Sequence, residues 1–312
     1  MNNSLKILPA LIAIIFPILL YGPAPTMAAT GAHNGAPADI ALIEEQGLAI
    51  GNSHSPATGF IADISWESIE DAPSAFGRSV GGVIGDYYYV FGGQFVTDMA
   101  LAYNLVTSTW QNSTPPIEGS FNSGFCIAAG SLYKLCGSDA VNDFERFDPA
   151  GDGYGTWSSL ALPSSEFRTT TNGCAWDGGN YIYANNCDYS NPPEAHFARY
   201  NIAENSWETL MPPPGPRRYA GLASVQGNIY LIGGLGLDDR DYHRCQMYLP
   251  DIDDWQDIAP HPDSLNFTST IVISDGSFIW TVGHGGGFGD YPISPHVHYY
   301  DPVPCHLPCP VL

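Results

Sequence analysis

The chain has 312 residues, of which 32 are acidic and 10 are basic, and its formal net charge is −22. This length suffices for a sizeable core or for an array of small repeated units. A surface this acidic cannot neutralise a phosphate backbone, so we exclude nucleic acid as a partner.

The N-terminal segment 1–29 has the order of a secretory signal peptide. Lys6 precedes an apolar stretch at 7–21, and small residues follow at 24–29. The apolar stretch is shorter than the roughly 20 residues that a membrane-spanning helix needs. We expect cleavage near Ala28 or Ala29, a secreted or periplasmic location, and no membrane span after signal removal. A retained membrane anchor is the alternative. Residues 30–58 are small, polar and unpatterned, which indicates a flexible leader.

Five tryptophans mark a repeat that begins after this leader. They are spaced by 44, 47, 50 and 48 residues, at Trp66, Trp110, Trp157, Trp207 and Trp255. Each of the five units has a hairpin pattern of two apolar runs around a pair of small or turn-forming residues. These pairs are Gly85-Asp86, Gly130-Ser131, Gly178-Gly179, Gly227-Asn228 and Asp275-Gly276. The repeat therefore predicts two strands joined by a tight turn in every unit.

A third strand with an aromatic residue follows each hairpin, and the tryptophan lies on a fourth. The aromatic residues are Tyr103, Phe147, Tyr200, Tyr248 and Tyr300. Four antiparallel strands in about 40 to 50 residues is the size of a propeller blade. A single such sheet cannot bury both faces, whereas blades stacked about an axis bury them with these aromatic rings.

The pattern resembles the kelch-repeat family of β-propellers, which also includes galactose-oxidase-like propellers. The resemblance rests on the glycine pair that ends the second strand, as in Gly92-Gly93 and Gly233-Gly234, on the downstream tyrosine, and on the tryptophan followed by prolines. The third unit departs from it, with Asn185-Asn186 in place of the glycines. The resemblance implies an all-β propeller of about five four-stranded blades over residues 59–304, followed by a short tail at 305–312.

The first and last units suggest how the ring closes. No tryptophan follows Tyr300, whereas the segment Phe60–Ile69 carries Trp66 and has no strands before it. We expect Phe60–Ile69 to supply the outer strand of the last blade, which would hide an exposed sheet edge. The alternatives are a ring completed by poorly matching sequence or a chain truncated from one with more blades.

Seven cysteines suit disulfides in an exported protein. Cys126 with Cys136 and Cys174 with Cys187 flank hairpin turns, so we predict both bridges, with buried free thiols as the alternative. The pairing of Cys245, Cys305 and Cys309 stays open, and Cys305 with Cys309 is the local choice. His284, His296 and His298 could hold a metal ion with Asp290, but we interpret them as ordinary polar residues. We expect no cofactor.

A candidate ligand site comes from counting eleven or twelve residues beyond each tryptophan. This count selects Arg78, Asn122, Arg168, Arg218 and Asn266, with Arg217 and Tyr219 adjacent. Guanidinium groups around a channel mouth suit carboxylates, as in acidic sugars or acidic peptide side chains. Alternatively, these arginines brace the turn between blades by binding backbone carbonyls.

We interpret the chain as a secreted binding module, expected to be a monomer, that recognises a protein, peptide or glycan through its top-face loops. The alternative is a carbohydrate-active enzyme resembling periplasmic sialic-acid mutarotases, with Glu166 as the candidate acid or base. We expect a copper radical oxidase to fit poorly, because it would need a cross-linked cysteine–tyrosine pair, two copper-binding histidines and a further tyrosine. A structural surface protein that uses its blade edges is a further possibility, since fold alone does not license a chemistry.

Overall fold

A computed structural model describes residues 68–138, 143–167, 173–187, 194–234, 236, 243–262, 271–284 and 294–302. By its contacts the chain divides into two units, one of which is Leu20–Ile69. The description below concerns the other unit, from Glu70 onwards. The predicted signal peptide at 1–29, leader at 30–58 and tail at 305–312 lie outside the described residues.

Nineteen strands form five antiparallel sheets in the described residues. The first sheet contains β1 (Val80–Ile84), β2 (Tyr87–Phe91), β3 (Ala100–Asn104) and β4 (Thr109–Asn112). The second contains β5 (Gly124–Ala128), β6 (Ser131–Leu135), β7 (Phe144–Pro149) and β8 (Gly155–Ser159). The third contains β9 (Gly173–Trp176), β10 (Tyr181–Cys187), β11 (Ala195–Asn201) and β12 (Ser206–Thr209).

The fourth sheet contains β13 (Gly221–Val225), β14 (Asn228–Ile232), β15 (Cys245–Leu249) and β16 (Asp254–Ile258). The fifth has three described strands, β17 (Ile271–Ser274), β18 (Ile279–His284) and β19 (Ser294–Tyr300). Within each sheet the spatial order of the strands is their order in the chain. Each sheet is therefore a meander, which is the topology of a propeller blade.

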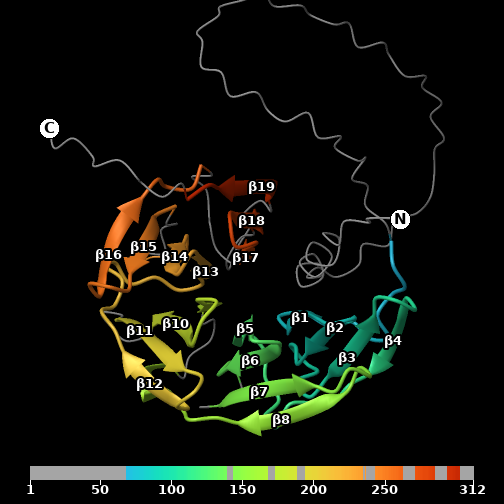
Figure 1. Ribbon diagram of the computed structural model, residues 1–312. Helices are drawn as coiled ribbons and strands as arrows, with labels where there is room; N and C mark the ends of the chain where they lie inside the picture. The colour runs from blue at the N-terminus through green and yellow to red at the C-terminus, as the bar shows by residue number, and fades with distance from the viewer. Residues whose placement is uncertain are drawn as a thin grey trace, which may run out of the picture. The chain divides into compact units, whose positions relative to one another are not determined.

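The five sheets follow one another around a common axis as the blades of a propeller (Figure 1). The first strands of neighbouring blades contact each other in the order β1, β5, β9, β13 and β17. These inner strands lie near the axis and the fourth strands at the periphery (Figure 1). The prediction of a five-bladed, all-β propeller is confirmed. The segment expected to complete the last blade, Phe60–Ile69, lies outside the described residues except for Ser68 and Ile69.

Aromatic rings fill the spaces between the blades, as the repeat predicts. In each of the first four blades the third-strand aromatic lies 5.1–5.3 Å from the tryptophan of the same blade, as Tyr103 does from Trp110 and Phe147 from Trp157. The tryptophan also reaches the preceding blade, where Phe91 lies 4.9 Å from Trp157. Large buried areas of this kind dominate the energy of a repeat interface.

The indole N–H groups add a repeated hydrogen bond to this packing. Each Nε1 donates to the carbonyl oxygen of the residue four positions after the preceding tryptophan, at 2.8–2.9 Å. The pairs are Trp110 with Glu70, Trp157 with Thr114, Trp207 with Ala161, and Trp255 with Met211. The four tryptophans therefore occupy equivalent environments. The bond to Glu70, four residues after Trp66, extends the same spacing to the first tryptophan segment.

Two hairpin turns differ by one residue from the predicted pairs. Ala128 pairs with Ser131, so the turn is Ala129-Gly130, and Val225 pairs with Asn228, so the turn is Gln226-Gly227. The first turn residues have φ of 50° and 52°, and the glycines 85° and 81°. Turns with positive φ at both central positions favour glycine, but here glycine is needed only at the second. Counting from glycine alone therefore shifted the expected register.

The two predicted disulfides are wrong. Cys126 and Cys136 are not joined, and neither are Cys174 and Cys187. The register pairs Cys126 with Tyr133 and Cys174 with Ala184. The two cysteines of each hairpin lie at different distances from its turn, so they are not opposed across the strands. Instead, Cys126 and Cys136 lie in the core between the second and third blades, against which Cys174 also packs.

Helical structure in the described residues is limited to the short 3-10 turn η1 (Ser165–Phe167). None of it is long and apolar enough to cross a membrane.

Candidate functional site

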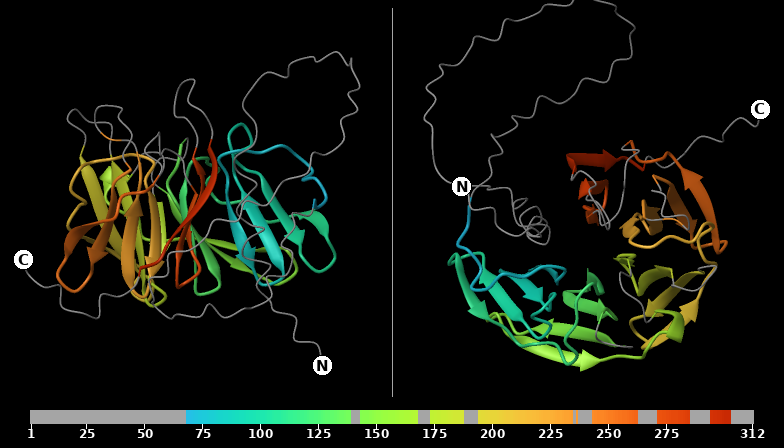
Figure 2. Two further views of the ribbon diagram at one scale, coloured as in Figure 1. Left: turned by 90° about the horizontal axis from the view of Figure 1, so that it is seen from above. Right: turned by 180° about the vertical axis from the view of Figure 1, so that it is seen from behind.

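One end of the propeller gathers the loops that could bind a ligand. Because the strands of a blade are antiparallel, the start of the inner strand, the β2–β3 type of loop and the connection to the next blade all lie at the same end of each sheet. The left view of Figure 2 shows the strands running between two ends, with the loops at these ends. We call the end at which the inner strands start the top face.

Three residues occupy one equivalent place on the top face. Arg78, Asn122 and Tyr219 each lie two residues before an inner strand, and their φ angles are 60°, 55° and 60°. Non-glycine residues rarely adopt this left-handed conformation, so its repetition reflects a common backbone path. The Asn122 amide also donates to the Arg78 carbonyl at 2.9 Å, which ties the first two blades together. We call this place the pre-strand position.

The predicted ring of three arginines and two asparagines needs correction. Arg218 lies one residue before the pre-strand position, which Tyr219 occupies. Arg168 and Asn266 precede their inner strands by five residues instead of two, and both lie outside the described residues. The inner strand begins 14 residues after Trp66, Trp110 and Trp207 but 16 residues after Trp157 and Trp255, so a fixed count does not reach the same position in every blade, and the count of eleven after Trp207 stops one residue short. Of the three counted residues that the structure describes, Arg78 and Asn122 share the pre-strand position and Arg218 does not.

Arg217 does not face a ligand site, because its side chain is buried in the fourth blade. Its exposed fraction is 2%, and its Nη2 donates to Gln246 Oε1 at 2.8 Å. Gln246 in turn donates from Nε2 to Asp257 Oδ1 at 3.0 Å. Asp257 also pairs with Arg244 at 2.7 Å. This chain of polar contacts crosses the fourth blade.

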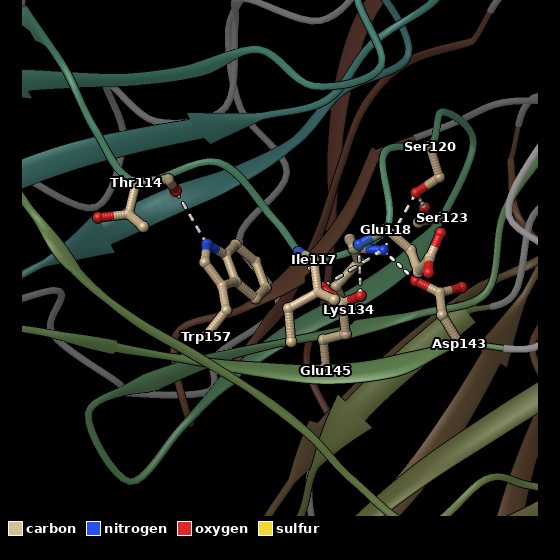
Figure 3. A network of polar contacts seen from close by, with 9 residues as sticks. All are labelled: Thr114, Ile117, Glu118, Ser120, Ser123, Lys134, Asp143, Glu145 and Trp157. Carbon is tan, nitrogen blue, oxygen red and sulfur yellow. Dashed lines mark hydrogen bonds and ion pairs between the residues drawn. The ribbon is translucent and has the colours of Figure 1, made fainter.

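A second buried polar cluster supports the top face at the second blade (Figure 3). Lys134 on β6 has an exposed fraction of 2%, and its ammonium forms an ion pair with Asp143. It also donates to Ser120 Oγ at 3.2 Å and lies 4.0 Å from Glu145 Oε2. Buried charges are tolerated when they are paired and hydrogen-bonded in this way. We call Lys134, Asp143 and Glu145 the Lys134 cluster.

The Lys134 cluster fixes the loop that leads into β5. Glu145 accepts hydrogen bonds from the Glu118 amide at 2.8 Å and from the Ile117 amide at 3.2 Å. Figure 3 shows Lys134 between Ser120 of this loop and the two carboxylates of the blade. The buried ions thus hold the backbone of a surface loop in one conformation.

One ammonium faces two carboxylates in this cluster, and both carboxyl groups are out of water. Burial raises the pKa of Asp143 and of Glu145, and the positive charge of Lys134 opposes that rise in each. Asp143 Oδ1 has no hydrogen-bond partner among the described residues. The cluster therefore sets two buried carboxyl groups against one ammonium beneath the top face.

The top face also presents an exposed aromatic ring. Phe95 lies in the β2–β3 loop with 83% of its surface exposed and a φ of 72°. Ile117, in the neighbouring connection, is 53% exposed. Sequence reasoning missed both Phe95 and the Lys134 cluster. Lys134 could have been noticed as a charged residue inside an apolar strand, opposite Glu145 on the next one, whereas the exposure of Phe95 has no local signal.

The remaining candidates are not brought together. The side chains of Glu166, His284 and His296 lie outside what the structure describes. His298 pairs with Thr281 across the strands, and its ring packs edge-on against His261 at 4.8 Å. Within the described residues no group of three or more histidine, cysteine or acidic side chains could hold a metal ion.

Comparison with known proteins agrees with the repeat architecture, although no protein-family model matches the sequence. The chain is 25% identical over 174 residues to the Kelch-like protein terF of Aspergillus terreus, covering 49% of this chain and 37% of that protein. It is 25% identical over 234 residues to Kelch-like protein 23 of Homo sapiens, covering 70% of this chain and 38% of that protein. The chain thus matches less than two fifths of the length of these relatives.

Among solved structures, that of YjhT superposes with a TM-score of 0.61 at 12% identity, covering 75% of this chain and 84% of that one. At this identity the likeness concerns the fold. It agrees with five sheets in meander order about one axis, built from units with equivalent tryptophans. The chain is thus similar in sequence to kelch-like proteins and has the fold of a five-bladed β-propeller.

Proposed function

We propose that the chain is a non-catalytic interaction module that binds a protein or peptide through the top face. The kelch relatives support this proposal, because they share a repeat scaffold whose loops can vary independently of the blades. The observation that carries the proposal is that the top-face loops combine a fixed backbone with exposed apolar side chains. Their backbones are fixed by internal hydrogen bonds, while the side chains of Phe95 and Ile117 are exposed.

The polar groups near this face also favour a scaffold role. Lys134 and Glu145 are buried and bind a loop backbone, and Arg217 is buried and binds Gln246. Of the basic side chains in the described residues, Arg78 is exposed and has no ion pair among them. A single arginine at the pre-strand position gives less support to a carboxylate-bearing sugar than the predicted ring did. We therefore favour a protein or peptide over an acidic glycan.

The proposal is tested by selecting binders from a random 12-residue peptide phage library on the immobilised protein. Selected peptides are synthesised and titrated by calorimetry, and we expect reproducible binding with micromolar Kd. The competing glycan hypothesis is tested by thermal shift with sialic acid and galacturonic acid. Failure to select any peptide would overturn the proposal, and a rise in Tm with either sugar would then indicate a carbohydrate ligand.

We also propose that the chain is exported after removal of the segment 1–29. The support is the order of charge, apolar residues and small residues in that segment. The test is N-terminal sequencing of the protein recovered from the medium or periplasm of an expressing cell. A mature N-terminus directly after Ala28 or Ala29 is expected, whereas an intact N-terminus in the cell membrane or cytosol would refute export.

A further inference from the structure

The β2–β3 loop of the first blade holds an aromatic side chain in an unfavourable backbone conformation. Phe95 has a φ of 72°, which bulky residues rarely adopt, and its ring is 83% exposed. Nothing in the packing of the blade explains why a phenylalanine stands there, since its ring contributes little buried surface. Strained residues of this kind concentrate at ligand-binding sites.

Hydrogen bonds on both sides keep Phe95 in that conformation. The Gln94 amide donates to the Gly77 carbonyl at 2.9 Å, and the Val96 amide donates to the Gly93 carbonyl at 3.1 Å. Met99 closes the loop through its amide, which donates to the Val96 carbonyl at 2.9 Å. Because the loop is ordered before any partner arrives, little conformational entropy is lost when it binds.

The connection that carries Ile117 lies directly beside this loop. The Ser120 amide donates to the Thr97 carbonyl at 3.1 Å. A Cβ at Gly119 would lie 2.8 Å from the same oxygen, so the two backbones touch. Ile117 is 53% exposed, and the Lys134 cluster holds its amide from below. Two apolar side chains are thus presented by adjacent, fixed loops.

Acidic side chains surround these apolar groups. Asp98 follows Phe95 on the first loop and Glu118 follows Ile117 on the second, and both are exposed. The Lys134 cluster beneath adds two carboxylates against one ammonium. Arg78 is the one exposed cation in the described segments that are hydrogen-bonded to these loops. The local charge is negative, like that of the whole chain at −22.

We propose that Phe95, Asp98, Ile117 and Glu118 form the docking patch for a partner segment in which an apolar side chain is flanked by lysine or arginine. The inference rests on the proposed function and names its site and partner class. The partner's apolar side chain packs on Phe95 and Ile117, since buried aromatic anchors dominate interface energies. Its cations lie against Glu118 and Asp98, and the negative field of the chain speeds their encounter.

The test uses the peptides that the full-length protein selects from the random 12-residue library. We expect lysine or arginine next to leucine, isoleucine, phenylalanine or tryptophan to be enriched. Phe95→Ala should weaken Kd by about tenfold or more. Glu118→Gln should weaken Kd by about threefold and reduce its dependence on salt between about 50 and 300 mM NaCl.

Matched controls are an exposed apolar and an exposed acidic residue away from the patch. Ile252 is 65% exposed in the β15–β16 turn, and Glu204 is exposed in the β11–β12 turn. Ile252→Ala and Glu204→Gln should leave Kd within about twofold, because neither residue touches the patch. If the selected peptides bind equally well to wild type and Phe95→Ala, the proposed docking patch is refuted, whereas the proposal that the chain is an interaction module still stands. If no peptide is selected, the proposed function itself fails.

Phe95→Asn gives a second readout that does not depend on a ligand. Asparagine tolerates positive φ better than phenylalanine does, so this variant should have a higher Tm and weaker peptide binding. Such opposite changes are expected of a residue retained for binding at the expense of stability. An unchanged or lower Tm would overturn the claim that Phe95 is strained for function.

Discussion

Replacing Lys134 by methionine should destabilise the propeller more than any other single change to a charged side chain of the second blade. The substitution keeps the length of the side chain but leaves Asp143 and Glu145 buried with no positive charge beside them. Removing one partner from a buried ion pair costs about 3–5 kcal/mol. Since whole domains are stable by only about 5–15 kcal/mol, a loss of that size is a large part of the total.

The expected decrease in Tm follows from this free energy. For a domain of about 150–250 residues, 1 kcal/mol shifts Tm by about 2–4 °C, so Lys134→Met should lower Tm by roughly 6–20 °C at pH 7.5. Differential scanning calorimetry measures the shift. Arg146→Met is the matched control, because it breaks a partly exposed ion pair with Asp148 at 2.8 Å. Its loss should stay below about 1 kcal/mol.

The stability lost in Lys134→Met should depend on pH, because the two carboxyl groups beside Lys134 can be protonated. Burial raises the pKa of Asp143 and Glu145 in the folded protein. A carboxyl group with a raised folded pKa contributes stability below its unfolded pKa of about 4, and that contribution is lost as pH rises through the folded pKa. Without Lys134 the pKa values of Asp143 and Glu145 should rise further, so both carboxyl groups are protonated more readily in the variant. The Tm difference between wild type and Lys134→Met should therefore shrink as pH falls from 7.5 to 5.

Two measurements test the contribution of the Lys134 cluster to stability. Adding Asp143→Asn to Lys134→Met deletes one of the unpaired buried charges and should restore part of the lost Tm. A Tm of Lys134→Met within about 2 °C of wild type at pH 7.5 would show that the cluster loses less than about 1 kcal/mol. The buried ion pair would then not support the top-face loop as described.

Three further experiments test the packing within and between the blades. Trp157→Phe removes the indole donor to the Thr114 carbonyl and should cost about 1–3 kcal/mol in thermal unfolding, a loss that Trp157→Tyr should not recover. Gly137 has a φ of 133°, and a Cβ there would lie 2.8 Å from the Phe121 carbonyl oxygen. Gly137→Ala should therefore be about 2 kcal/mol worse than Gly85→Ala, whose Cβ meets open space; equal losses would contradict the close approach. Burial raises the pKa of the Cys126 thiol, so iodoacetamide should label it only after unfolding, and rapid labelling of the native protein, followed by mass spectrometry, would show that the thiol is accessible.

The sequence was most informative where a signal is local and repeated. In the first four blades the tryptophan follows its third-strand aromatic by seven residues, or ten in the second blade, and these four ring pairs form. The hairpin turns were located to within one residue, because glycine marks positive φ but does not say which turn position needs it. The structure does not form the predicted disulfides, because the two cysteines of each hairpin lie at different distances from its turn and so do not face each other.

The composition of the top face depended on lengths that vary among the blades. Counting eleven residues from Trp207 placed Arg218 where the backbone places Tyr219, since the inner strand begins 14 residues after Trp207, as it does after Trp66 and Trp110, and twelve is the matching count. Arg217, predicted to face a ligand, is instead buried against Gln246. Whether an arginine faces solvent or the interior depends on the side chains that meet it from other strands, which no single segment specifies.

By itself the sequence determined the class of fold, the number of blades and the rings between them, because turns and apolar spacing act within about fifty residues. Only the tertiary structure decided which charged groups are buried and which apolar groups are exposed. Lys134 meets Asp143 and Glu145 from another strand, and Phe95 is exposed on a loop whose hydrogen bonds come partly from the segment before its own blade. Such properties arise from contacts between segments, and so they appear only when the segments are assembled.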